Sequence, residues 1–185
     1  NFNLTGFGLS ERQVAEHVKL YEGYCKKIGE IREKISTAGE GNATFSEIRE
    51  LKLEEGFCIN AIKLHELYFE NMTKKKTSLS ESNSLYKMMV KTFGSGQACH
   101  ENFVATGSMR GIGWVVMYYD SEGDRLFNAW VNEHDVGHLA GCTPLLIMDV
   151  FEHAFMLDYG LKRADYITTF INAVDWDVVS QRFSK

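Results

Sequence analysis

The stretch of sequence that decides the fold is MDVFEHAFMLDY, residues 148–159, near the C-terminus of the chain. It places a carboxylate, Asp149, and an imidazole, His153, four residues apart in an otherwise apolar run, with Glu152 beside the imidazole. Polar side chains in such a run either lie at the edge of a strand or helix, or they bind a metal ion. The rest of the chain has to decide between these two interpretations.

Length and composition are typical of a soluble globular protein, since 44% of the 185 residues are hydrophobic and 24% are charged. Such a chain forms one large or two small domains. The net charge of −5 argues against a nucleic-acid partner, and no apolar stretch is long enough to span a membrane. Four widely spread cysteines without a CxxC pair favour reduced thiols in a cytoplasmic protein. The chain does not open with the basic and then apolar segment of a signal peptide.

The expected elements follow the order helices, short sheet, helices, which is typical of an α+β fold. Ser10 and Ser46 are the expected N-caps of two long helices, and two strand-like runs flank DSEGD, residues 120–124, as in an antiparallel hairpin. The sequence therefore predicts an N-terminal helical-hairpin domain, residues 1–80, followed by a C-terminal α+β domain with a short antiparallel sheet, residues 81–185. Apolar residues recur at helical spacing in five segments: 10–35, 46–72, 85–94, 95–110 and 163–183.

Three histidines and one aspartate form a ligand set suited to a mid-series transition metal such as iron or manganese. Any one of these histidines alone could instead be a hydrogen-bonded core residue. Zinc would accept the same set, although a structural zinc site more often contains sulfur. The spacing in the sequence does not prove that the four side chains meet. They are His17 and His65, each within a predicted helix, together with Asp149 and His153.

At these residues the chain resembles the iron/manganese superoxide dismutase family. Residues 149–155, DVFEHAF, match the family signature Asp-x-(Trp or Phe)-Glu-His-(small)-aromatic. SERQVAEHV (10–18) and LHELYFENM (64–72) are similar to the segments that carry the family's first and second ligands, and GIGWVVMYYD (111–120) is similar to its Gly-Ser-Gly-Trp strand. Fold analogy alone would not imply a function, but matched ligands do imply a metal. The resemblance implies one iron or manganese ion per subunit, with four ligands: His17, His65, Asp149 and His153.

The resemblance also implies roles for residues around the metal. Trp114 and Phe151 are expected beside the ligands. The residue that bonds the metal-bound solvent is usually Gln in the family and His in some members, and His134, a candidate catalytic residue, matches the His variant, although it could instead be an ordinary loop histidine. The family further implies a homodimer, in which Glu152 reaches His153 of the partner subunit.

The chain departs from the family at the gate to the metal. The family's first helix has a His four residues and a Tyr eight residues after the first ligand, and these positions are Tyr21 and Cys25 here. Both are candidate catalytic or substrate-contacting residues, although Cys25 could instead be a buried, inert cysteine. Tyr24 could supply a phenol from one residue earlier, but a rotation of about 100° per residue predicts a different geometry. Met156, also expected beside the ligands, stands where the family usually has a Tyr of the gate network.

Three functions remain open at this point. The first is superoxide dismutation by one-electron cycling of the metal. The second uses the same fold and metal site on dioxygen and a small organic substrate, as an oxidase or oxygenase, which the altered gate would suit. The third is a non-enzymatic scaffold, against which the retained ligands argue, because inward-facing polar groups are costly without a role. Outside these sites, His100 and His138 match no ligand position and are expected at the surface.

Overall fold

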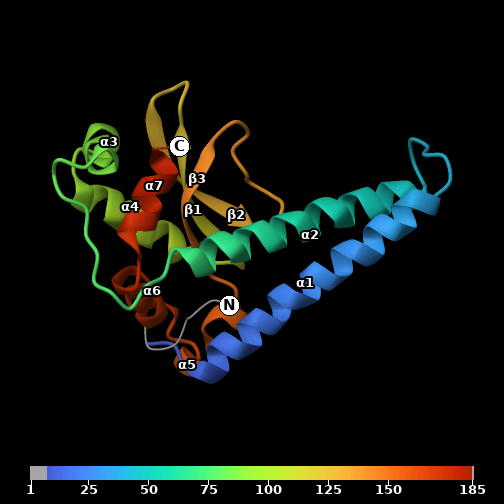
Figure 1. Cartoon of the computed structure of the whole chain (residues 1–185), viewed down its shortest axis with the longest axis horizontal. Coiled ribbons are helices and arrows are strands. Elements are labelled where there is room, and N and C mark those ends of the chain that lie inside the picture. The colour runs from blue at the N-terminus through green and yellow to red at the C-terminus, as the bar shows by residue number, and fades with distance from the viewer. Residues whose placement is uncertain (1–7, 185) are drawn as a thin grey trace.

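The computed structural model describes residues 8–184. Two long helices, α1 (Glu11–Thr37) and α2 (Glu47–Glu70), form an antiparallel hairpin that extends away from the rest of the molecule (Figure 1). The hydroxyls of Ser10 and Ser46 accept hydrogen bonds from backbone amides three residues further along the chain. These bonds satisfy N–H groups that the first turn of a helix leaves without partners. The predicted helical hairpin and both of its N-caps are therefore confirmed.

The rest of the described chain is an α+β body built on a three-stranded antiparallel sheet with the strand order β2-β1-β3. The predicted hairpin across residues 120–124 is confirmed. The segment predicted as helical over residues 163–183 contains two helices, because Val174 leaves the helix and pairs with Met72 in an isolated β-bridge. The elements of the body are α3 (Ser84–Phe93), α4 (Gly96–Gly107), β1 (Gly113–Asp120), β2 (Arg125–Asn132), β3 (Thr143–Asp149), a 3-10 turn (Glu152–Ala154), α5 (Met156–Tyr159), α6 (Arg163–Asn172) and α7 (Trp176–Phe183).

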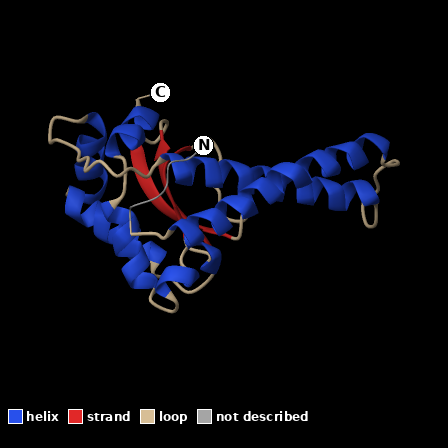
Figure 2. Ribbon diagram, turned by 60° about the horizontal axis from the view of Figure 1, so that its bottom comes forward, coloured by secondary structure: helices blue, strands red, loops and turns tan. Residues whose placement is uncertain are grey.

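The main hydrophobic core joins the base of the hairpin to the sheet. Leu64 and Tyr68 of α2 are buried in the same cluster as Trp114 of β1 and Phe170 of α6. Figure 2 shows the outer part of the hairpin extending beyond this body, where a smaller cluster holds the two helices together: Ile28, Ile31 and Cys58. The division into domains at residue 80 stays a prediction. Within residues 8–184 no helix combines the length and the apolar character needed to cross a membrane.

Asn71, which is buried, fixes the end of α2 against β3. Its side-chain amide donates to the carbonyl oxygen of Ile147 at 3.1 Å, and its Oδ1 accepts from the amide of Ile147 at 2.9 Å. Such a pair of bonds replaces the backbone pairing that a further strand would give. Because Ile147 lies two residues before Asp149, this contact brings the end of β3 close to His65 on α2.

Candidate metal centre

Four side chains from four elements meet inside the molecule: His17 from α1, His65 from α2, Asp149 from the end of β3 and His153 from the 3-10 turn. Each offers one ligand atom, and these atoms all lie within 4.8 Å of one another. Oδ2 of Asp149 is central, because it lies 3.0, 3.1 and 3.8 Å from the Nε2 atoms of His17, His153 and His65. Three of the four residues are buried and His153 is half-buried. The structure thus brings the four predicted ligands together.

The Nε2 atom of His65 gives the clearest sign that this cluster binds something. Nδ1 of the same ring lies 2.7 Å from the carbonyl oxygen of Ala61, so Nδ1–H donates and Nε2 carries the lone pair. That Nε2 is buried and has no hydrogen-bond partner among residues 8–184. An unpartnered buried acceptor costs about 1–3 kcal/mol, which a bound metal ion would remove. A histidine that ligates a metal commonly has its other nitrogen fixed by a backbone carbonyl in this way.

The charges at the cluster also suit a metal cation. Burial by itself would raise the pKa of Asp149, but attraction to His153 and His17 holds that pKa well below its ordinary value. Burial lowers the pKa of His17 and lowers that of His65 to about 3. Burial acts in the same direction on His153, where the Asp149 carboxylate outweighs it and raises the pKa. The site therefore offers a carboxylate and two neutral imidazoles, those of His17 and His65, while a metal ion would have to displace any proton that Asp149 stabilises on His153.

His134 lies in the buried layer around this cluster, and its two ring nitrogens have different partners. Nε1–H of Trp114 donates to Nδ1 of His134 at 3.0 Å, so Nδ1 carries no proton. Burial lowers the pKa of His134 to about 4, and the neutral ring therefore carries its proton on Nε2. Nε2 lies 3.0 Å from the hydroxyl oxygen of Tyr24 and donates to it. The hydroxyl proton of Tyr24 is then available for another acceptor.

The tyrosine beside His134 is thus Tyr24, whereas sequence analysis favoured Tyr21 and Cys25. The hydroxyl of Tyr21 donates to Glu66 at 3.2 Å, and the Cys25 thiol, burial and the Glu66 carboxylate together raise the pKa of Tyr21. Cys25 itself is exposed. Helix geometry could have predicted this contact. Tyr24 is seven residues after His17 and differs from it by only about 20° around the helix axis, whereas Cys25 is eight residues after His17 and differs by about 80°. Tyr24 therefore shares the face of His17 more closely than Cys25 does.

The aromatic residues predicted beside the ligands are in contact with them. The ring of Trp114 is fully buried, and its centroid lies 4.9 Å from that of His65. Phe151 stacks on His153, with 4.9 Å between centroids and 15° between ring planes. These rings cover apolar sides of the cluster and keep water away from the ligand atoms.

Four other residues considered in the sequence lie farther out. Glu152 and Met156 are exposed in the single chain. His138 and His100, which were expected at the surface, are both partly exposed. Nδ1 of His138 lies 2.8 Å from the hydroxyl of Tyr118, and His100 lines a cavity away from the metal centre.

Gln13 is a residue of the site that sequence analysis missed. Its side chain is fully buried, its amide donates to the carbonyl oxygen of His153, and its Oε1 accepts from the amide of Leu157 at 3.1 Å. Gln13 therefore ties α1 to the turn that carries a ligand. Its place in the site could have been predicted from its position four residues before His17, on the same helix face.

Comparison with known proteins agrees with this arrangement. A model of the family described as iron/manganese superoxide dismutases, C-terminal domain, matches residues 81–182. The iron superoxide dismutase of Aquifex pyrophilus is 36% identical over 184 residues, which cover 96% of this chain and 85% of that protein. The iron superoxide dismutase of Cupriavidus metallidurans is 32% identical, and the match covers 96% of this chain and 89% of that protein. A protein of Haloferax volcanii named superoxide dismutase [Mn] 2 is 36% identical, and the match covers 66% of this chain and 60% of that protein. The chain therefore belongs to the iron/manganese superoxide dismutase family.

Proposed function

We propose that the protein binds one iron or manganese ion through His17, His65, Asp149 and His153, and that it removes superoxide by dismutation. The observation that supports this most directly is the buried, unpartnered Nε2 of His65 beside three other ligand atoms. The chain's relatives are named superoxide dismutases, some with iron and some with manganese, so the proposal covers both metals.

In this proposal the bound ion supplies a one-electron couple. Two superoxide anions and two protons give one dioxygen and one hydrogen peroxide, so the site has to deliver protons for the reductive half of the reaction. Tyr24 suits this task, because His134 donates to its oxygen and leaves its hydroxyl proton free to be donated. We assign to Tyr24 the role that sequence analysis considered for Tyr21 and Cys25.

Metal analysis of the His65→Ala variant tests the site. Wild-type protein should contain close to one iron or manganese ion per chain, and His65→Ala should lose most of it together with its superoxide-removing activity. His100→Asn is the matched control, because His100 lies outside the metal centre, and it should keep both. A His65→Ala protein that keeps its full metal content and activity would show that the ligands are assigned wrongly.

We further infer that two copies of the chain associate around Glu152, and that Glu152 reaches His153 of the partner subunit. Glu152 is exposed next to His153, as this contact requires. Exposed apolar side chains gathered in one segment are typical of protein interfaces. Three such side chains follow Glu152 closely in the sequence: Met156, Leu157 and Leu161, which are 43%, 50% and 91% exposed.

Sedimentation velocity tests the dimer. Wild-type protein should sediment as a dimer, and Glu152→Ala should shift the equilibrium toward the monomer. Glu81→Ala, which removes an exposed glutamate from the loop before α3, is the control and should leave the dimer intact. A wild-type protein that sediments as a monomer would overturn the inference.

The oxidase or oxygenase alternative is not proposed, because the named relatives are dismutases and no feature of the described site favours an organic substrate. The cytoplasmic location stays a prediction. It rests on the cysteines, all four of which are free thiols within residues 8–184.

A further inference from the structure

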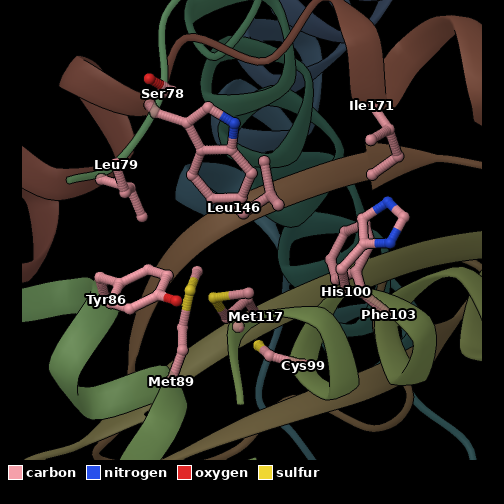
Figure 3. A pocket seen from close by; sticks show the side chains of 12 residues that line it. Ser78, Leu79, Tyr86, Met89, Cys99, His100, Phe103, Met117, Leu146 and Ile171 are labelled. Atoms are coloured by element: carbon pink, nitrogen blue, oxygen red, sulfur yellow. The ribbon is translucent and has the colours of Figure 1, made fainter. Parts of the chain in front are cut away.

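A cavity of about 170 Å³ lies between α3, α4 and the sheet, and none of the described residues that line it belongs to the metal centre. Figure 3 shows Tyr86 and Met89 on one side of the cavity and His100 and Phe103 on another. The walls are almost entirely apolar. The remaining apolar side chains that line it are Leu79, Cys99, Met117, Leu146, Ile171 and Trp176.

The size of the cavity suits one six-membered ring. A protein cavity of about 150 Å³ lined by apolar side chains stays dry and binds benzene. The ring of Tyr86 lies directly against Gly96, because a Cβ added at Gly96 would come 2.8 Å from Cε2 of Tyr86. The cavity can therefore accept an apolar ring against side chains that are already in place.

The mouth of the cavity differs from its interior, because it is polar and carries a positive charge. An adjoining depression shares four lining residues with the cavity, Ser78, His100, Ile171 and Trp176, and Lys76 is among the residues that it adds. Among the described residues, the side chains of Ser78 and His100 have no hydrogen-bond partner and Lys76 forms no ion pair. A cation, a hydroxyl and an imidazole are therefore available to a ligand at the mouth.

We propose that this cavity binds a small cyclic monocarboxylate, with its six-membered ring between Tyr86, Met89 and Phe103 and its carboxylate at Lys76 and His100. An apolar interior with a few polar groups at one end fixes the orientation of such a ligand. One lysine beside two hydrogen-bonding groups matches a single negative charge rather than the two of a phosphate monoester. The ligand would bind independently of the metal, because the two sites share no residue.

Isothermal titration calorimetry of the full-length, metal-loaded protein tests the proposal, with benzoate as the probe and benzyl alcohol as its uncharged counterpart. Each chain should bind one benzoate molecule. Benzoate should bind about fivefold more tightly than benzyl alcohol, which is the factor expected for one exposed ion pair. Lys76→Gln should lower the affinity for benzoate about fivefold and leave the affinity for benzyl alcohol unchanged. Lys75→Gln is the matched control, because Lys75 is the exposed neighbour outside the lining, and it should change neither.

Ser78→Trp places an indole at the mouth and should abolish binding of both probes, while superoxide removal stays at the wild-type rate. Ser78 is exposed, so this substitution does not disturb the core. The proposal would be overturned if millimolar benzoate did not bind, or if benzoate still bound to Ser78→Trp. The proposal would also fail if Lys75→Gln and Lys76→Gln lowered the affinity for benzoate equally, or if benzyl alcohol bound as tightly as benzoate.

Discussion

A chain of hydrogen bonds runs from Trp114 through His134 to Tyr24, and in each bond it is clear which group donates the proton. The indole can only donate, so Nδ1 of His134 must accept and Nε2–H must donate to Tyr24. The low pKa of His134, caused by burial, keeps the ring in this neutral form at neutral pH. At the scale of single residues, the direction of donation from His134 to Tyr24 is therefore set by one indole.

Tyr24→Phe should lower superoxide removal per bound metal ion by about tenfold, the size of effect usual for residues that orient a metal site. The phenylalanine keeps the ring packing and removes only the hydroxyl that bonds His134. Tyr21→Phe is the matched control on the same helix and should have a much smaller effect, which stopped-flow decay of superoxide would measure. Equal losses in the two variants would show that Tyr24 has no special role.

His134 should also make stability depend on pH. Because burial lowers its pKa from an ordinary value of 6.5 to about 4, the unfolded chain binds a proton between these values that the folded chain does not. The free energy of unfolding should therefore fall as the pH drops from 6.5 to about 4. His134→Gln cannot titrate, so urea unfolding across this range should give it a shallower slope than the wild type. Parallel slopes would mean that His134 titrates alike in both states.

At the scale of elements, the position of the 3-10 turn depends on α1 through Gln13. Gln13→Leu would leave the carbonyl oxygen of His153 and the amide of Leu157 without their partner. We expect the free energy of unfolding to fall by about 2 kcal/mol, the cost of unpaired buried groups. Metal content should fall as well, because His153 loses its support. Urea unfolding and metal analysis check this, with the exposed Gln181→Leu as a control that should change neither.

The two long helices and the hairpin of β1 and β2 could be predicted because their signals are local, whereas the sequence pattern did not identify β3, the 3-10 turn or α5. Ser10 and Ser46 precede helical patterns, and the signature at residues 149–155 fixes the order of the ligands. The contact between Tyr24 and His134 could not be predicted in the same way, since it joins residues 110 positions apart and depends on where the loop after β2 lies. The break of the last helical segment likewise depends on a tertiary contact, the β-bridge that pairs Met72 with Val174.

At the scale of the whole molecule, the metal centre joins the two parts of the chain. His17 and His65 come from the hairpin, and Asp149 and His153 come from the body. An ion that binds only the folded state stabilises it by about 2.7 kcal/mol at a free concentration one hundred times its dissociation constant. Removal of the metal should therefore lower the midpoint of thermal unfolding by roughly 5–10 °C in a chain of this length. Scanning calorimetry should show this loss in the wild type and no further loss in His65→Ala.

The rate of superoxide removal per bound ion tests the central claim most directly. Metal-free protein would be reloaded separately with iron, manganese and zinc, and superoxide decay would be followed by stopped flow. We predict fast removal in proportion to the bound iron or manganese, and none with zinc, which has no one-electron couple. A protein that carries a full iron or manganese ion at this site, and still leaves superoxide to decay at its spontaneous rate, would contradict the claim.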